Sequence, residues 1–110
     1  MDLNLVVLAG RIASPPDLRV FDSGTRLLRY LVTVKADEPQ RRIDVVPVTL
    51  WDPPQELVDS DSTPGQRVWV AGTVQRRFWS APEGRHSRLE VVADQVCSSE
   101  TSPAAAAAAP

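Results

Sequence analysis

Five apolar runs rich in β-branched residues, each bounded by turn-forming residues, constrain the fold of this chain more than any other feature. Val, Ile, Thr and aromatic side chains favour strands, whereas Gly, Pro, Ser and Asp favour turns. The runs lie at residues 3–9, 27–34, 43–51, 67–79 and 86–96. Strands of this kind, with turn chemistry between them and within one domain's length of chain, predict a small β-barrel.

The segment between the third and fourth runs has the signals of a helix. Residues 53–63 begin with Pro53-Pro54, which suits a first helical turn, and Pro64-Gly65 follows them as a helix end. One helix between strands three and four of a five-stranded barrel is the OB-fold arrangement. The predicted fold is therefore all-β, a five-stranded OB-fold barrel with one short helix.

The composition changes near the end of the chain. Residues 98–110 hold Ser, Thr, Pro and Glu, then six alanines and a proline, and have no large apolar side chain to bury. We expect one OB-fold domain over residues 1–97 and a disordered tail over residues 98–110.

Several functional classes are not expected from this sequence. One cysteine, Cys97, and one histidine, His86, argue against a disulfide framework and a zinc site. We expect no metal, no cofactor and no catalytic residue, because no nucleophile–histidine–acid set or Gly-rich phosphate loop is recognisable. No apolar run approaches the roughly 20 residues of a membrane helix, and residues 1–4 lack the basic start of a signal peptide. The prediction is a cytoplasmic binding protein without membrane contact.

Alternation along the strands separates an interior face from an outer face, because successive side chains point to opposite sides. Trp51 and Trp79 fall on the outer face, and Arg77 falls beside Trp79. An indole is a stacking surface for any base and guanidiniums hold phosphates, so the pattern indicates sequence-tolerant binding of single-stranded nucleic acid. The residues predicted for the barrel interior are Val46, Val48, Leu50, Val68, Val70, Val74 and Phe78.

Local groups have to carry such binding, because the formal net charge of −2 is unlike that of a typical non-specific nucleic-acid binder. Packing is the alternative for each tryptophan, since large aromatic side chains are mostly buried. We assign Phe21 and Tyr30 to packing, and Trp69 to packing or a subunit interface. The candidate DNA-binding residues are Trp51, Trp79, Arg41, Arg42, Arg76, Arg77, Arg85 and Arg88.

Six short motifs follow one another in a fixed order, at residues 4–11, 16–24, 48–51, 64–72, 77–79 and 89–91. The ordered set resembles the bacterial single-stranded DNA-binding protein family over residues 4–96. This resemblance implies an OB-fold domain that binds single-stranded DNA, usually as a homotetramer, in DNA replication, recombination and repair. It also implies that Trp51 and Trp79 are the stacking residues.

The sequence departs from the family pattern in four places. The segment 36–42 lacks the aromatic residue that the family carries there, Val45 replaces a family tryptophan, and Pro47 replaces a basic or polar residue. Two missing stacking surfaces, at about 1–3 kcal/mol each, should weaken binding. The tail ends in Ala-Ala-Ala-Pro rather than in an acidic tip, so recruitment of replication enzymes by such a tip is not expected. We expect a short paralogue within the family.

Two functions remain open from the sequence. The leading one is a nucleoid-associated, non-enzymatic protein that binds single-stranded DNA without sequence specificity. The alternative is an OB-fold protein-interaction module of the replication machinery with little DNA binding, which the acidic balance favours. The same side chains would serve RNA as well as DNA, and the sequence fits a dimer as well as a tetramer.

Overall fold

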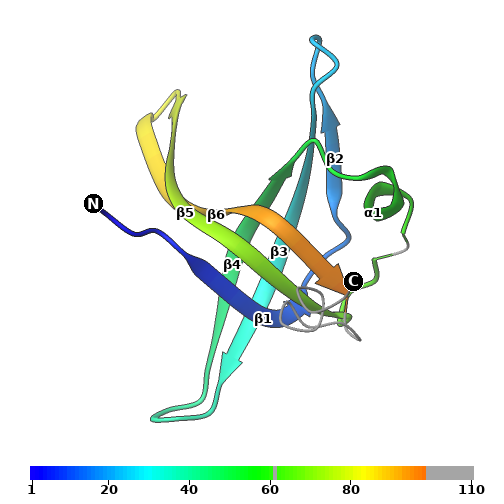
Figure 1. Cartoon of the computed structure of the whole chain (residues 1–110). Helices are drawn as coiled ribbons and strands as arrows, with labels where there is room; N and C mark the ends of the chain where they lie inside the picture. The colour runs from blue at the N-terminus through cyan, green and yellow to red at the C-terminus, as the bar shows by residue number, and fades with distance from the viewer. Residues whose placement is uncertain (61, 99–110) are drawn as a thin grey trace.

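Strand pairing closes five strands of this protein into a ring (Figure 1). The computed structural model describes residues 1–60 and 62–98. β1 pairs with both β5 and β3, which completes the ring β1-β5-β6-β4-β3, and β2 adds to the outer edge of β3. The elements are β1 (Val6–Ile12), β2 (Asp17–Val20), β3 (Arg26–Ala36), β4 (Arg42–Trp51), α1 (Gln55–Asp59), β5 (Arg67–Ala81) and β6 (Gly84–Ser98). The predicted OB-fold, five ring strands with one helix before the fourth of them, is confirmed.

Two elements differ from the sequence-based prediction. β2 was not expected as a separate strand, because all four of its residues are exposed and so show no alternation of apolar and polar side chains. The helix α1 has five residues rather than the expected 53–63, since Ser60 already has extended backbone angles. Among the described residues, no helix has the length and apolar character needed to cross a membrane. Ser98 ends β6, and residues 99–110 of the expected tail lie outside the described residues.

The core fills the ring with side chains from the inner faces of its strands. Val32, Val48 and Val70 are fully or almost fully buried there. The predicted interior positions Val48, Leu50, Val68 and Val70 belong to this core, and Val46 packs against it. β6 carries one extra residue, Asp94, because Ala71 pairs with Gln95 whereas the next residue of β5, Gly72, pairs with Ala93. Such a bulge bends a strand and helps a sheet to close.

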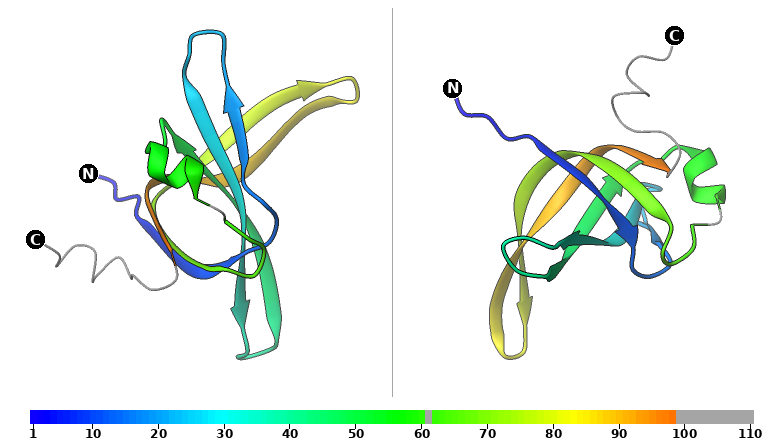
Figure 2. Two further views of the ribbon diagram at one scale, coloured as in Figure 1. Left: turned by 90° about the vertical axis from the view of Figure 1, so that its right-hand side faces the viewer. Right: turned by 90° about the horizontal axis from the view of Figure 1, so that it is seen from below.

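Val74 and Phe78 correct the prediction for the interior. Both lie on the face of β5 that carries Val70, yet Val74 is 37% exposed and Phe78 is 73% exposed. The reason is that β5 and β6 extend beyond the ring as a long hairpin, so that no opposite strand covers their inner face there. Figure 2 shows this hairpin and the β2–β3 and β3–β4 hairpins projecting from the ring.

A side chain from the N-terminal segment fixes the base of the β5–β6 hairpin. β1 pairs with β5 as far as Val6 opposite Gly72. Two residues further on, the amide of Asn4 donates a hydrogen bond to the Val74 carbonyl (2.7 Å) and accepts one from the Val74 N–H (2.9 Å). Asn4 thus pairs with the backbone of β5 where β1 no longer does.

Candidate nucleic-acid interface

Both tryptophans of interest are partly exposed, Trp51 by 49% and Trp79 by 41%. Trp51 ends β4, two residues after Thr49, and therefore lies on the same side of the sheet as Thr49. Thr49 in turn pairs with Arg29 of β3, which places Arg29 on that side as well. Arg29 and Trp79 line one hollow of about 270 Å³. The two indoles are therefore presented on one outer face of the sheet.

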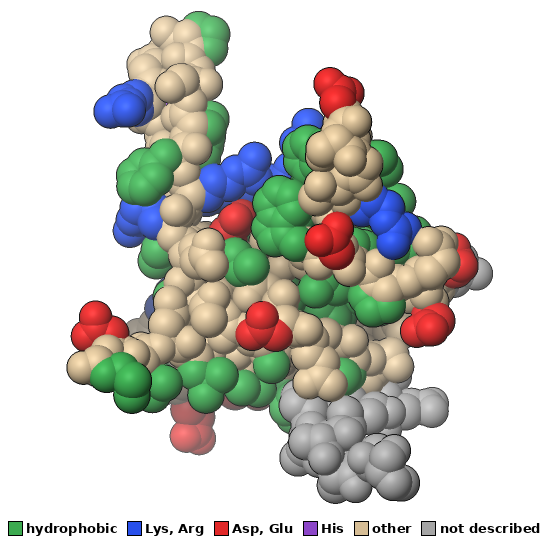
Figure 3. All heavy atoms as spheres, turned by 45° about the horizontal axis from the view of Figure 1, so that its top comes forward, with side chains coloured by type: hydrophobic (Ala, Val, Ile, Leu, Met, Phe, Trp, Pro, Cys, Tyr) green, Lys and Arg blue, Asp and Glu red, His purple; other side chains and the backbone are tan. Residues whose placement is uncertain are grey.

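Three guanidinium groups from three strands gather on this face. Arg29 comes from β3, Arg77 from β5 and Arg88 from β6, with Arg77 and Arg88 directly opposite each other. With Trp79 they form the hollow just described. We call Trp51, Trp79, Arg29, Arg77 and Arg88 the basic aromatic face. In Figure 3, Lys and Arg side chains line the space between the projecting β5–β6 and β2–β3 hairpins, together with hydrophobic side chains.

The charges on this face are not balanced. The pKa of Arg29 is lowered, first by partial burial and then by the positive charges of Arg77, Arg88 and Arg19. Glu90 acts in the opposite direction and raises the pKa of Arg29, but it is the smallest of these influences. Guanidiniums that repel one another gain most from an added anion, and a phosphate is a good partner for their planar donors.

Buried polar atoms lie beneath the basic aromatic face. Thr49 and Glu90 are buried, and Thr49 Oγ1, Glu90 Oε2 and the Nε of Arg88 have no hydrogen-bond partner among the described residues. Buried polar atoms are usually paired, by protein groups or by ordered water. The floor of the face is therefore polar.

Trp51 and Trp79 are each stacked against a second aromatic side chain. Phe21, from the turn after β2, stacks on Trp51 with a centroid distance of 5.8 Å and an angle of 24°. His86 stacks on Trp79 at 5.5 Å and 18°. The Cζ atom of Arg88 lies 5.9 Å from the Trp79 ring centroid, within the range of a cation–π contact. Phe21 does pack, as expected, but it does so against a residue of the candidate site.

The structure separates the other predicted arginines from this face. Arg76 and Arg85 leave the β5–β6 hairpin on its opposite side, where Arg76 donates a hydrogen bond to the Ser87 hydroxyl at 3.1 Å. Arg41 and Arg42 lie at the β3–β4 turn, at the start of β4, whereas Trp51 is at its end. Both are exposed beside carboxylates, Arg41 at 4.0 Å from Asp37 and Arg42 at 3.0 Å from Asp44. Of the predicted arginines, Arg77 and Arg88 line the hollow that contains Trp79 and Arg29. Arg85 lines a second hollow, of about 600 Å³, with Trp79 and His86 near the hairpin tip.

Arg29 and Phe21 join the site although the sequence-based analysis did not include them. Arg29 had a usable signal, since it is the charged residue in the apolar run 27–34 and has outer-face parity. Phe21 had none, because its partner Trp51 is 30 positions away and lies on another strand.

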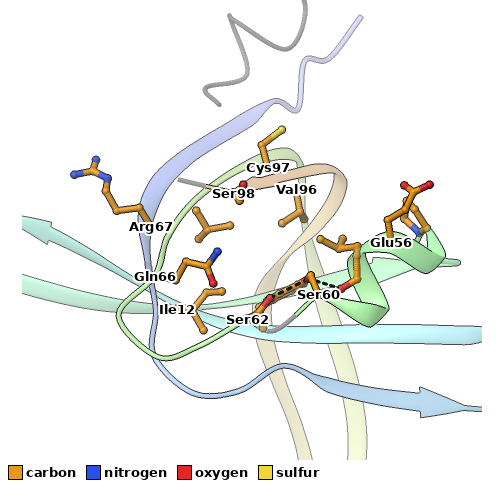
Figure 4. A pocket seen from close by; sticks show the side chains of 13 residues that line it. Ile12, Glu56, Ser60, Ser62, Gln66, Arg67, Val96, Cys97 and Ser98 are labelled. Atoms are coloured by element: carbon orange, nitrogen blue, oxygen red, sulfur yellow. Dashed lines mark hydrogen bonds between the residues drawn. The ribbon is translucent and has the colours of Figure 1, made fainter. Parts of the chain in front are cut away.

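A separate pocket of about 430 Å³ lies between α1 and the end of the ring that is formed by the start of β5 and the end of β6 (Figure 4). Gln66, Cys97 and Tyr30 are among its lining residues, and burial raises the pKa of Tyr30 to about 12. Neither Trp51 nor Trp79 lines it. It also lacks a gathering of guanidiniums, so it is not part of the basic aromatic face.

Comparisons with known proteins agree with this geometry. The "Single-strand binding protein family" model matches residues 3–98. A single-stranded DNA-binding protein from Oceanobacillus iheyensis is 32% identical over 104 residues, which are 90% of this chain and 65% of that protein. One from Caldanaerobacter subterraneus subsp. tengcongensis is 30% identical over 99 residues, which are 86% of this chain and 66% of that protein. The chain thus spans about two thirds of the length of these relatives.

The solved structures add the same fold. The Plasmodium falciparum SSB in complex with ssDNA superposes with a TM-score of 0.79 and 19% sequence identity, and the match covers 91% of this chain and 97% of that one. This likeness concerns the fold alone. The family match over residues 3–98 carries the assignment, and by it the chain belongs to the single-strand binding protein family.

Proposed function

We propose that this protein binds single-stranded DNA without sequence specificity, by stacking bases on Trp51 and Trp79 and by holding phosphates with Arg29, Arg77 and Arg88. The observation that carries the proposal is the presence of two half-exposed indoles on one outer face, with three guanidiniums gathered around one of them, Trp79. Family membership supports it, since the relatives are named single-stranded DNA-binding proteins.

The chemistry of the face explains tolerance of sequence. Every base has a flat π-face, so an indole binds any base by stacking, at about 1–3 kcal/mol per base. Arginine contacts to phosphate hold the strand without reading base edges, and they release counterions. Such a site needs no catalytic group, metal or cofactor, and no reaction is proposed.

Removal of each indole tests this proposal. Trp51→Ala and Trp79→Ala should each weaken oligo-dT binding by about 1–3 kcal/mol, while both variants keep the fold because both rings lie outside the core. Intrinsic tryptophan fluorescence, titrated with oligo-dT at several salt concentrations, measures the affinity, and circular dichroism checks the fold. Trp69→Phe is the matched control, since Trp69 lies on the β1 side of the ring and is half-buried. Unchanged affinity in both alanine variants would contradict the stacking mechanism.

A homo-oligomer is part of the proposal. β1 pairs with β5 from Val6 to Arg11 but with β3 only at Arg11 and Ile12, so most of its other edge has no partner strand in the described chain. Val7, beside this edge, and Val45 are exposed apolar residues. An edge of this kind is suited to pairing with a second copy. Light scattering of the purified protein distinguishes a monomer from a dimer or tetramer.

In the cell, the proposed role is to cover exposed single strands during DNA replication, recombination or repair, in the nucleoid. The alternative, an interaction module with little DNA binding, is favoured by the pairing of Arg41 and Arg42 with carboxylates away from the face. The same titration separates the two functions, because a fluorescence signal that does not change with oligo-dT at low salt is the result expected of the module.

A further inference from the structure

One face of the Trp79 ring has a titratable neighbour. His86 is directly opposite Trp79 across the β5–β6 hairpin, and the two rings stack at 5.5 Å and 18°. The edge of the imidazole contacts the hairpin turn, because its Nε2 lies 3.0 Å from Oε1 of Glu83. The rings of both residues remain partly exposed. A nucleotide stacked on Trp79 would therefore bring its phosphate close to the imidazole.

We propose that His86 is a positioning residue for Trp79, and that its protonated form strengthens the binding of single-stranded DNA at the hairpin. Affinity should then rise as the pH falls through the range in which histidine gains its proton. The inference rests on the proposed function, because it concerns the same face.

The protonated ring improves three interactions at once. An imidazolium next to the indole π-face adds a cation–π attraction to the existing stack. Its N–H donates a charge-assisted hydrogen bond to Glu83, which holds the imidazole parallel to Trp79. Its positive charge also attracts the phosphate of a bound nucleotide and displaces a further counterion from the strand.

Among the charged side chains that the structure describes around His86, none other changes its charge between about pH 6 and about pH 8. Glu83 faces it from the turn, Arg88 from β6 and Arg77 from β5, and Arg85 lines one hollow with it. Arginine and glutamate side chains do not change charge between about pH 6 and about pH 8, and histidine does. His86 is the single histidine of the whole sequence. A change in affinity over this range that is lost in His86→Gln therefore reports on His86.

The test is a titration of the full chain with oligo-dT at about pH 6 and about pH 8, over a series of salt concentrations. One added cation at an exposed site should raise the affinity roughly two- to fivefold at the lower pH. It should also steepen the plot of log affinity against log salt by about 0.7, the value for one phosphate contact on a single strand. Anisotropy of a labelled oligonucleotide measures both without relying on tryptophan emission, which pH alters by itself.

Two variants separate the charge of His86 from its bulk. His86→Gln keeps a polar planar group but does not titrate, so its affinity should be the same at both pH values. Glu83→Gln keeps the histidine and removes the carboxylate beside its Nε2, so its pH response should persist.

Three results would overturn the inference: a wild-type affinity that is independent of pH, an affinity that falls on acidification, or a pH response that survives in His86→Gln. Absence of binding at every pH would instead contradict the proposed function, so the two failures are distinguishable.

Discussion

Arg76 and Arg77 are neighbours in the sequence whose side chains leave the β5–β6 hairpin on opposite faces. Arg77 lies opposite Arg88 and lines the hollow that also contains Arg29 and Trp79. Arg76 donates a hydrogen bond to Ser87 on the other side. The two residues share charge, length and sequence environment, so replacing each by alanine tests which face of the hairpin holds the DNA.

The expected magnitude follows from counterion release. Each phosphate contact on a single strand contributes about 0.7 to the slope of log affinity against log salt. Loss of the Arg77 contact should therefore lower this slope by about 0.7 and reduce the affinity about fivefold near 0.1 M salt. The difference should vanish near 1 M salt. Arg76 has no such contact, and at about 0.1 M salt its charge is largely screened beyond about 10 Å, so Arg76→Ala should lose less than about twofold.

Anisotropy of a labelled oligo-dT, measured for both variants over the same salt series, gives the slopes and the affinities together. Thermal unfolding followed by circular dichroism confirms that each variant is folded. Equal losses in the two variants, or a larger loss in Arg76→Ala, would refute the assignment of binding to the basic aromatic face.

Two further predictions concern stability and the aromatic pair at the other end of the face. Gly72→Ala should lower the free energy of unfolding by about 3 kcal/mol in a urea titration, because a Cβ at this position would clash with the Val92 carbonyl oxygen. Gly65→Ala is the control and should cost only about 1 kcal/mol, since Gly65 has φ +88° and open space around it; equal losses would contradict the larger cost expected from the clash at Gly72. Phe21→Ala should weaken oligo-dT binding roughly two- to twelvefold, since an aromatic pair contributes about 0.5–1.5 kcal/mol, and unchanged affinity would show that Trp51 needs no support from Phe21.

The five apolar runs and the turn residues between them predicted the ring, and alternation along the strands predicted the side on which Trp51 and Trp79 lie. Val48, Leu50, Val68 and Val70 alternate with outer residues along regular strands, and all four are in the core. The outer-face position of Trp51 follows from the same period of two.

The sequence alone did not predict burial or side-chain contacts where the strands extend beyond the ring. Phe78 has interior parity, yet nothing in the sequence marks the point where β5 leaves the ring and its inner face meets water. The gathering of Arg29 with Arg77 and Arg88 depends on how β3, β5 and β6 neighbour one another, which single strands do not encode. The separation of Arg76 from Arg77 was accessible from parity alone, but grouping the arginines as sequence pairs obscured it.

The amide of Asn4 has a consequence for how other molecules can approach the hairpin. A carboxamide offers the same donor and acceptor as a peptide bond, so at Val74 it imitates a neighbouring strand and leaves no vacant ladder position there. A strand of another chain therefore cannot pair with β5 at Val74, at the base of the β5–β6 hairpin. A molecule that docks at this base of the hairpin has to contact its side chains, as a flexible polyanion with unpaired bases can do.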